Sequence, residues 1–476
     1  MSKITRRSFL AGGAAGFAGA TTALGLLNRS KAWAADTTGY RALVCVFLFG
    51  GLDHADTVFP FSQGEYDQLA NLRAGLFNAY NGQPSTSRAR DNLLQITPAN
   101  ASAFGGREFA LSPQMPEMQN LFESGEMAIV GNVGPLVEPT DRDSFDNQSV
   151  VLPPRLFSHN DQQSSWMALD VEGAQLGWGG QFADAVLASD ANANPLFTSI
   201  TTSNSIFLAG NTSFPFFASV NGGRELELNI VEQEFLLGGN DRFNAQRQAV
   251  ENYYNTTDFG SLGVMQRDFT RMAAQGIENN SIFQSSLESI VPFATIFPEA
   301  PLGNQLNSVA EAIQVGSAMN VSRQIFFVGI GGFDTHSNQA SRLPGLQAQI
   351  SGALMAFRNA MIERNLWNGV TVFTGSDFGR TVIDNGDGTD DGWGAHHFVL
   401  GGSVQGGNIY GDIPSPDIDS QFYTPTRGRL IPTTSVERYA ATLGRWFGLS
   451  EAELSTALPK LTSFGDADLG VFGSIS

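Results

Sequence analysis

The sequence predicts an α/β protein whose mostly parallel central sheet is sandwiched by helices, and three observations support this prediction. Strand patterns rich in apolar and β-branched residues occur at 41–49, 324–330 and 370–375, as in sheets covered on both faces. Glycine and aspartate follow each of them, which is typical of the carboxyl ends of parallel strands that bind ligands. A long helical segment at about 342–364 separates the second pattern from the third, and this order predicts parallel neighbours.

The remaining chain provides further elements for the same domain. Strands are expected at 127–134 and 398–400, and helices at about 65–80, 113–124 and 436–447. Residues 241–320 are mostly helical in pattern, with prolines that mark a break, and they are predicted to form a helical insertion. Since neither a tandem repeat nor a convincing linker separates these segments, residues 36–476 are expected to form a single domain.

The first 35 residues have the pattern of a twin-arginine signal peptide. Residues 5–10 (Thr-Arg-Arg-Ser-Phe-Leu) carry the signature, a mild apolar stretch continues to about Leu27, and residues 32–34 give an A-x-A cleavage pattern. The stretch is short and glycine-rich, so a stable membrane anchor is the less favoured alternative. The leader predicts a periplasmic or secreted bacterial protein, with the twin-arginine translocase as its partner during export. This route usually carries folded proteins, often with a cofactor in place, which is compatible with a metal site.

The charge of the chain argues against some classes of partner. Five of the 27 Lys and Arg residues, and none of the 46 Asp and Glu residues, lie in the leader. The remaining chain therefore carries 22 basic and 46 acidic residues, a formal net charge of −24. Such a surface repels nucleic acid and anionic lipid. The single cysteine, Cys45, excludes an intrachain disulfide, and its apolar surroundings predict a buried strand residue.

All five histidines lie in segments that also carry aspartates. They are His54, His159, His336, His396 and His397. The neighbouring acids are Asp53, Asp56, Asp161, Asp334, Asp377, Asp390 and Asp391. A single His beside an Asp is usually a surface turn, but chance does not readily explain all five in such segments. We therefore expect most of these residues to converge on one site.

Carboxylate and imidazole groups without thiolate predict a divalent metal. Zinc is the favoured ion, and Mn²⁺, Fe, Ca²⁺ and Mg²⁺ are alternatives. Two adjacent ions could clamp a phosphate or sulfate ester. Arg380 or Arg155 could hold such an anion through a bidentate contact. The acidic loop at 384–388 does not match the spacing of an EF-hand, so it is predicted to be a solvated turn.

Two residues have both a structural and a functional interpretation. Asp53 stands where a ligand would follow the first strand, but a lone Asp after Gly-Gly is more often a turn or a helix cap. Ser158 could cap a helix that starts there. Alternatively, its hydroxyl stands at a helix N-terminus, where the dipole and free N–H groups favour an anionic group.

Several motifs together resemble the domain-of-unknown-function 1501 (DUF1501) family, and the resemblance covers nearly the whole mature chain. They are Gly50-Gly51-Leu52-Asp53, Phe157-Ser158-His159-Asn160-Asp161-Gln162, Gly331-Gly332-Phe333-Asp334-Thr335-His336, Ser376-Asp377-Phe378-Gly379-Arg380-Thr381, Gly392-Trp393-Gly394-Ala395-His396-His397 and Arg429-Leu430-Ile431-Pro432-Thr433-Thr434. Members are exported bacterial proteins, and the family is grouped with the alkaline phosphatase and sulfatase superfamily. That superfamily has a mostly parallel sheet between helices.

The resemblance implies a set of metal ligands and a nucleophile. The implied ligands are Asp53, Asp334, His336, Asp377, His396 and His397. The implied nucleophile is Ser158, with Thr57 a weaker candidate. This chain departs from the usual pattern at three places, because Phe378 and Asp391 each stand in place of a histidine, and Leu52 and His54 replace the usual Asn and Gly.

The leading hypothesis is therefore an exported metal-dependent hydrolase of phosphate or sulfate esters. Ser158 and Arg380 would be catalytic, and the partner would be an anionic ester substrate. The alternative is a non-catalytic exported protein that keeps the superfamily fold and binds a glycan, a metal or a protein. The two missing imidazoles favour this alternative.

Overall fold

The computed structural model describes residues 36, 38–192, 195–217, 263, 265, 282, 285–319, 321–465 and 468–473. The predicted signal peptide and the larger part of the predicted insertion at 241–320 lie outside these residues. Within the described part of the chain, no helix combines the length and apolar character needed to cross a membrane.

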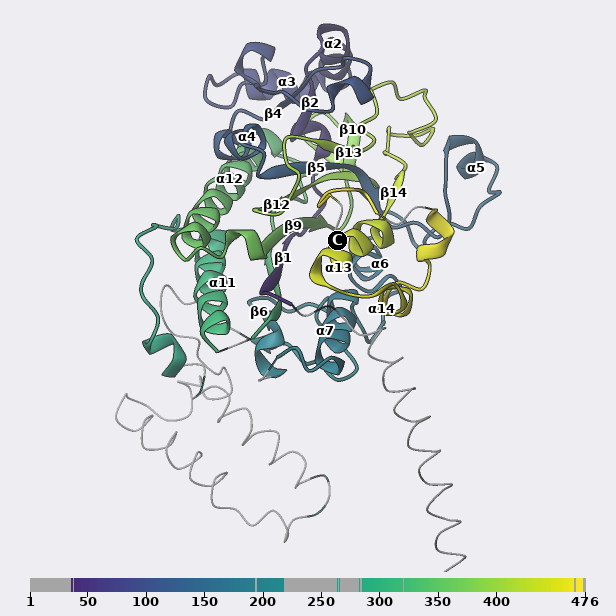
Figure 1. Ribbon diagram of the computed structural model, residues 1–476. Coiled ribbons are helices and arrows are strands. Elements are labelled where there is room, and N and C mark those ends of the chain that lie inside the picture. Colours follow the sequence, from purple (N-terminus) through teal and green to yellow (C-terminus); the bar gives the residue numbers. More distant parts are fainter. Residues whose placement is uncertain are drawn as a thin grey trace, which may run out of the picture.

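A nine-stranded sheet forms the centre of the molecule (Figure 1). Its strand order is β13-β5-β12-β9-β1-β8-β6-β7, and β14 pairs with β5 in addition. The strands are β1 Arg41–Leu48, β5 Met127–Gly134, β6 Ser199–Thr201, β7 Phe216–Phe217, β8 Arg323–Ile330, β9 Val370–Ser376, β12 Ala395–Gly401, β13 Ile409–Gly411 and β14 Thr434–Ser435. Only β12 pairs in the antiparallel direction, with both β5 and β9. The predicted mostly parallel α/β sheet is thereby confirmed.

Strand β1 is the central element of this sheet. It pairs in parallel with β8 on one side and with β9 on the other, so that Val44 lies opposite both Phe326 and Val372. The expectation that the strands joined by the long helix are neighbours is therefore wrong. They are parallel, but β1 lies between them. The reason is long-range, because β1 pairs with two strands that lie hundreds of residues later in the chain.

Helices cover both faces of the sheet, as Figure 1 shows. Side chains alternate along β1, so Val44 and Val46 enter one core while Cys45 and Phe47 enter the other. The first core includes residues of α4 (Pro116–Glu123), α11 (Pro301–Ala318) and α12 (Gln339–Glu363). The second core includes residues of α6 (His159–Ala168), α7 (Trp178–Ala188), α13 (Val436–Phe447) and α14 (Glu451–Ala457). Cys45 is fully buried, as predicted.

Helix α11 belongs to the main layer of helices. It contacts α12 and β8, and its buried residues Leu306, Ala310 and Ile313 are part of the first core. This end of the segment predicted as an insertion is therefore part of the sandwich. The extent of the insertion and the single-domain division remain predictions.

Smaller elements surround one end of the sheet. A three-stranded sheet has the order β2-β4-β3, and β10 and β11 form a two-stranded sheet. The helix predicted at 65–80 is two helices, which meet at the buried Arg73. The remaining elements are η1 His54–Asp56, β2 Val58–Pro60, α2 Gln63–Leu72, α3 Ala74–Asn81, η2 Arg90–Asn92, β3 Leu94–Ile96, η3 Ala101–Phe104, β4 Phe109–Leu111, α5 Arg142–Asp146, η4 Pro195–Thr198, η6 Trp367–Gly369, β10 Arg380–Asp384, β11 Thr389–Asp391 and η7 Leu461–Phe464.

Candidate metal centre

The candidate centre lies where β1, β8 and β9 end. Because these strands are parallel neighbours around β1, the loops that follow them meet at one edge of the sheet. The contact is direct, since the backbone N–H of Gly50 donates to Asp377 Oδ2 at 3.2 Å. Gly50 has a φ of +112°, and a Cβ atom there would lie 2.3 Å from the backbone nitrogen of Asp334. Only glycine allows these loops to approach so closely.

His159, Asp334 and Asp391 form a group that could hold a metal ion. One ligand atom from each lies within 4.8 Å of the others. The distance from His159 Nε2 is 3.7 Å to Asp334 Oδ1 and 3.9 Å to Asp391 Oδ1. Ligand atoms on a tetrahedral zinc ion, with bonds of roughly 2.0–2.2 Å, are about 3.3–3.6 Å apart. Both distances from His159 Nε2 are within a few tenths of an ångström of this spacing.

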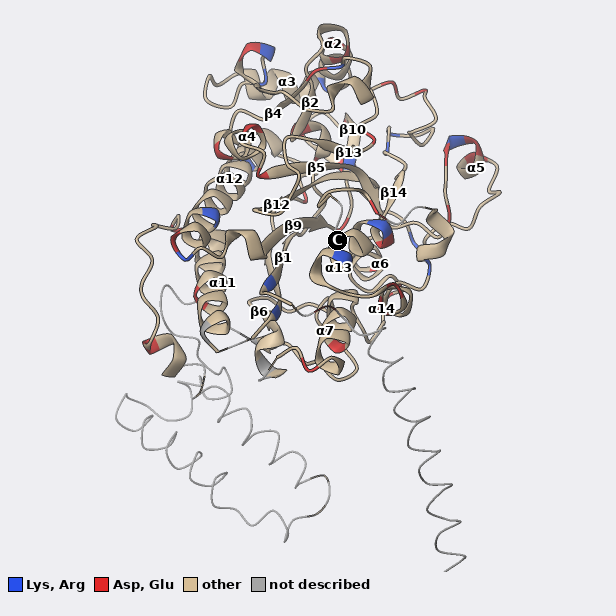
Figure 2. Cartoon of the chain, viewed as in Figure 1, with Lys and Arg blue, Asp and Glu red and all other residues tan. Residues whose placement is uncertain are grey.

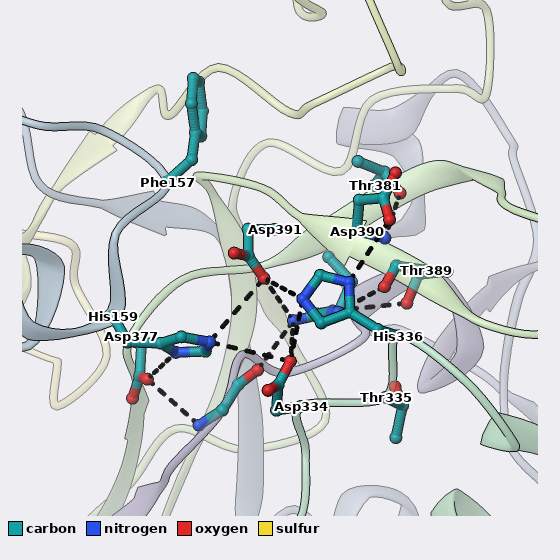
Figure 3. A network of polar contacts seen from close by, with 12 residues as sticks. Phe157, His159, Asp334, Thr335, His336, Asp377, Thr381, Thr389, Asp390 and Asp391 are labelled. Atoms are coloured by element: carbon teal, nitrogen blue, oxygen red, sulfur yellow. Dashed lines mark hydrogen bonds and ion pairs between the residues drawn. The ribbon is translucent and has the colours of Figure 1, made fainter.

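His336 approaches the same two carboxylates. Its Nε2 atom lies 3.2 Å from Asp334 Oδ1 and 3.1 Å from Asp391 Oδ1. Its Nδ1 atom lies 3.4 Å from Asp390 Oδ1. Figure 3 shows the imidazoles of His159 and His336 on either side of the Asp334 and Asp391 carboxylates. The structure therefore brings together the predicted ligands Asp334 and His336, with Asp391 between the two rings.

Asp377 orients the imidazole of His159. The distance from His159 Nδ1 to Asp377 Oδ2 is 2.7 Å, and the ring of His159 packs against Phe378 at 4.7 Å between centroids. The hydrogen bond to Asp377 raises the pKa of His159 although burial opposes the shift. With its Nδ1 proton directed at a carboxylate, the ring offers Nε2 to a cation, as metal-binding histidines commonly do.

Asp377 is itself fully buried, and only one of its two carboxylate oxygens has hydrogen-bond partners among the described residues. Its Oδ2 atom also accepts from Gln163 Nε2 at 3.0 Å. Its Oδ1 atom has no hydrogen-bond partner among the described residues. Because a buried carboxylate oxygen without a partner is costly, this atom calls for a cation or a water molecule. The candidate ligands themselves, an imidazole nitrogen and two carboxylate oxygens, are donors that fit a divalent ion.

Arg380 supplies positive charge to the same carboxylates. Its fully buried guanidinium donates to Asp334 at 3.1 Å, to Asp391 at 2.8 Å and to the carbonyl of Gly50 at 3.0 Å. It also donates to Thr389. Arg380 thus contacts the candidate ligands, and its hydrogen bonds are with the chain's own acceptors. This arrangement fixes the carboxylates instead of leaving a free fork for an anion. The predicted catalytic role of Arg380 stays a prediction.

Ser158 directly precedes the candidate ligand His159. It is the N-cap residue of α6 but makes no side-chain capping hydrogen bond. Its hydroxyl instead donates to Asp161 Oδ2 at 2.6 Å. Arg155, the other candidate for anion binding, is exposed and lies 3.5 Å from Asp161 Oδ1. Ser158 therefore has a carboxylate that could accept its proton.

Asp53 lies outside this cluster. Its two carboxylate oxygens accept from the two terminal nitrogens of Arg73, at 2.7 and 2.8 Å. Gln339 Nε2 donates to it as well, at 2.6 Å, and Asp53 caps η1 through Asp56 N. Both partners of the Asp53–Arg73 pair are buried. The structure therefore shows Asp53 as a helix cap in a buried ion pair. Thr57, the weaker candidate nucleophile, is also buried, and its hydroxyl donates to the carbonyl of Asp53.

The histidine pair that follows does not join the cluster in this structure either. His396 and His397 lie on β12, whose side chains alternate between the two faces of the sheet, so the rings point to opposite sides. His396 Nδ1 accepts from the backbone N–H of Asn132 at 3.0 Å, which places the ring proton on Nε2. His397 packs against Trp166 and Tyr439. Burial lowers the pKa of His397 to about 3.

Three residues in or beside the candidate metal centre were not predicted as ligands. His159, Asp390 and Asp391 appear in the sequence only as members of the His and Asp segments. The β10–β11 pair brings Asp391 back beside Arg380, since these residues are opposite each other in the register. The available signal for His159 was its position one residue after Ser158, at the start of a predicted helix.

Comparisons with solved structures find distant likenesses. The crystal structure of Ps i-CgsB in complex with k-i-k-neocarrahexaose matches with a TM-score of 0.34 and 9% identity, over 90% of this chain and 78% of that chain. Ps i-CgsB without this ligand gives 0.31 and 8%, over 90% and 77%. A mutant of alkaline phosphatase PafA gives 0.26 and 13%, over 73% and 64%. At TM-scores this low, the likenesses carry no argument about the site or the substrate of this chain.

Comparison with curated proteins finds no match. A family model gives a match over most of the chain. The model described as protein of unknown function (DUF1501) matches residues 40–454. This range contains β1, β8 and β9 together with the whole cluster of His159, Asp334 and Asp391. The resemblance seen in the sequence motifs is thereby confirmed, and the chain belongs to the DUF1501 family.

Proposed function

We propose that this protein is an exported hydrolase of phosphate or sulfate esters that uses one divalent metal ion. The ion is held by His159, Asp334 and Asp391, with His336 beside the same oxygens. One observation carries the proposal. Segments far apart in the chain converge at the carboxyl ends of three parallel strands on a His/Asp group, in which the buried Asp377 holds the ring of His159.

The charges in the centre favour a single ion. The four carboxylates are those of Asp334, Asp377, Asp390 and Asp391. Arg380 contacts Asp334 and Asp391, Arg427 contacts Asp390, and Asp377 contacts His159. With neutral imidazoles, four negative and two positive charges leave two negative charges, which one divalent cation balances. Oxygen and nitrogen donors without sulfur favour Zn²⁺, followed by Mn²⁺, Ca²⁺ or Mg²⁺. When bound, the ion would act as a Lewis acid on the ester oxygen.

The chain's own residues hold the reacting groups in this proposal. Ser158 supplies the nucleophilic hydroxyl, and Asp161, which already accepts its hydrogen bond at 2.6 Å, takes the proton. The bond from Ser158 Oγ to phosphorus or sulfur forms as the bond to the ester oxygen breaks, and the alcohol leaves with the proton that Asp161 took. Water then cleaves the enzyme ester and restores the Ser158 hydroxyl. Asp377 keeps His159 in its tautomer and orientation. Arg380 positions Asp334 and Asp391.

Metal analysis and an ester panel test the proposal together. The full chain, exported in a native host and recovered after removal of its leader, is expected to contain about one Zn²⁺ or Mn²⁺ per chain by elemental mass spectrometry. The protein should hydrolyse an aryl phosphate or an aryl sulfate, and Ser158→Ala should abolish turnover while the metal remains bound. A protein that retains no metal, and hydrolyses no ester with Zn²⁺, Mn²⁺ and Ca²⁺ supplied, would falsify the proposal.

A non-catalytic binding protein is the second candidate function. The observation that favours it is the guanidinium of Arg380, which donates to acceptors within the chain. If the parent binds metal but hydrolyses no ester, and if Ser158→Ala binds metal as the parent does, this candidate is supported over the enzyme.

Export through the twin-arginine route is part of the proposal. Replacing Arg6 and Arg7 by lysine should leave the precursor in the cytoplasm, because the arginine pair is read by the translocase. Cell fractionation followed by immunoblotting measures the outcome, with Lys3→Arg as a control outside the signature. Processing and export that continue in the double variant would contradict this route.

A further inference from the structure

A second feature, a cavity of about 300 Å³, lies next to the candidate metal centre. Gln163 lines it and also donates to Asp377, so one side chain borders both sites. Phe49, which precedes Gly50 at the end of β1, lines it as well. The volume is at the lower end of the range of ligand pockets, roughly 300–1,000 Å³.

We propose that this cavity binds the uncharged, polyhydroxylated part of a ligand, such as a neutral sugar ring. The inference rests on the proposed function in one respect, because the bound sugar would be the alcohol portion of the ester. It names the substrate class of that site, namely a phosphate or sulfate ester of a carbohydrate.

Unused hydrogen-bonding groups line the cavity. The side chains of Asn160, Ser164 and Asn204 have no hydrogen-bond partner among the described residues. Asparagine offers two donors and an acceptor, and serine offers one donor and two acceptor positions. Sugar hydroxyls both donate and accept, so they match such groups. A purely apolar ligand would leave these groups without partners.

The charge of the lining disfavours an anion in the cavity itself. Among the described residues that line it, none is Lys or Arg, and Glu172 is the one with an ionisable side chain. The Nη1 atom of Arg155 lies 3.4 Å from Glu172 Oε2, but Arg155 does not line the cavity. A phosphate or sulfate group is best held by cationic side chains. An uncharged ligand therefore fits the cavity, and the anionic group belongs at the metal centre.

Apolar side chains complete the lining. Phe49 is held in place by ring contacts with Phe47 and Phe327, at 4.7 and 6.3 Å between centroids. Met167 and Ile206 contribute further apolar surface. Sugar rings present C–H groups as well as hydroxyls, so a lining with an aromatic ring and polar amides matches both. The same combination of apolar walls and a few polar groups is typical of specific small-molecule pockets.

The relative position of the two sites gives the ligand an orientation. Gln163 Nε2 contacts Asp377, whose other neighbours are His159 and the N–H of Gly50. A sugar in the cavity would thus lie on the Gln163 side of the cluster. An ester substituent directed past Gln163 would point toward His159 and Asp334.

Ligand-observed NMR with residues 36–476 tests the inference. The probes are glucose, galactose, N-acetylglucosamine and maltose, each at about 10 mM, because single-pocket sugar contacts are expected to give dissociation constants near the millimolar range. At least one probe should bind to both the metal-depleted and the Zn²⁺-loaded protein. Ser164→Phe, which fills the cavity, and Asn204→Leu, which removes a polar group, should each weaken binding by about tenfold.

Ser102→Phe is the matched control, since Ser102 is exposed in η3 and distant in sequence from the cavity residues. It should leave sugar binding unchanged, and thermal unfolding should show that all three variants are folded. The inference fails if none of the four sugars binds, if binding is unchanged in both cavity variants, or if inorganic phosphate displaces the sugar from metal-depleted protein.

The outcomes separate this inference from the proposed function. A protein that binds Zn²⁺ and hydrolyses an aryl ester, but binds none of the sugars, overturns the sugar pocket alone. A protein that binds a sugar in a manner sensitive to Ser164→Phe, but retains no metal, overturns the metal-dependent hydrolase alone.

Discussion

Asp391 is the residue that connects the parts of the candidate centre. Its Oδ1 atom lies 2.8 Å from Arg380, 3.1 Å from His336 Nε2 and 3.9 Å from His159 Nε2. It stands where the resemblance leads one to expect a histidine, so the sequence alone made it look like a defect in the site. The structure shows a carboxylate in the middle of the cluster, and a carboxylate is itself a metal ligand.

We predict that Asp391→Asn weakens metal binding by at least about 10- to 100-fold, because even partners of a ligand have effects of that size. The substitution keeps the shape of the side chain but removes its negative charge. Competition of a chromogenic chelator for Zn²⁺ measures the affinity. Asp91→Asn, an exposed acid in η2, should bind Zn²⁺ like the parent. Equal affinities of the parent and Asp391→Asn would exclude Asp391 as a ligand.

Glu437 is a buried acid away from the cluster, at the N-terminus of α13. Burial raises its pKa to about 7, against the hydrogen bond from Ser435 and the charge of Lys460. In the unfolded chain the pKa is near 4.5. The folded protein therefore binds more protons between these two values. The stability that the neutral Glu437 side chain allows is fully present at low pH, and it is lost as the pH rises from about 4.5 toward 7.

We predict that Glu437→Gln stabilises the protein by about 2–3 kcal/mol at pH 8 and changes stability little below about pH 4.5. Glutamine cannot ionise, so the cost of a buried carboxylate disappears. Urea unfolding at the two pH values measures the difference. Glu451→Gln, which removes an exposed acid from α14, should not show this pattern. A Glu437→Gln variant that is less stable than the parent at pH 8 would contradict the prediction.

At the scale of the elements, the ends of parallel strands determine where the site lies. The strand patterns of β1, β8 and β9 were readable from sequence, and so were Asp334, His336 and Asp377 at or just beyond strand ends. The close approach of these ends depends on Gly50, whose N–H reaches Asp377 and whose φ of +112° suits glycine.

Gly50→Ala should therefore damage the centre more than the fold. A Cβ atom would meet Asp334 N at 2.3 Å, so the loop that carries Asp334 must move. We expect a loss of stability of about 1–3 kcal/mol and a larger relative loss of Zn²⁺ affinity. Gly64→Ala is the control, since nothing lies within 4 Å of its added Cβ in α2. Thermal unfolding and zinc titration report the two effects, and an unchanged affinity in Gly50→Ala would refute the argument.

Other features of the site could not be predicted from local patterns. The position of β1 between β8 and β9 depends on pairings between segments hundreds of residues apart. The strand β12 begins before the histidine pair and not after it, so the alternation of the strand separates His396 from His397. Asp53 is turned away by Arg73, a residue at the junction of two helices that the sequence suggested were one. Each of these outcomes is set by tertiary contacts.

At the scale of the molecule, the charged residues are spread over the chain, and most of the histidines are buried. Figure 2 shows Asp and Glu at many places on the ribbon, from α2 at one end to α7 at the other, with Lys and Arg at scattered positions. Three of the five histidines are nevertheless buried within the fold, namely His54, His396 and His397. Both ring nitrogens of His54 lack hydrogen-bond partners among the described residues. Such rings are stable only in the neutral form.

This burial predicts a loss of stability on acidification. Burial lowers the pKa values of His54 and His397 to about 3, with a contribution from Arg73 at His54, and it lowers that of His396 as well. In the unfolded chain these pKa values are near 6.5. Between about pH 6.5 and 3 the unfolded state therefore binds more protons, so the free energy of unfolding falls with decreasing pH. At about pH 5 each ring should contribute a loss of about 2 kcal/mol.

The buried Glu437 has the opposite pH dependence over part of this window, so the test is best made in the Glu437→Gln background. We expect the free energy of unfolding there to fall by at least about 4 kcal/mol between pH 7.5 and pH 5, from His54 and His397 together. Adding His397→Gln should reduce this loss by about 2 kcal/mol, and His54→Leu should do the same. Gly64→Ala serves as the control, because it changes no ionisable group and its added Cβ has nothing within 4 Å. If the loss on acidification is the same with and without His54 and His397, carboxylate titration and not the buried rings governs the acid stability of this fold.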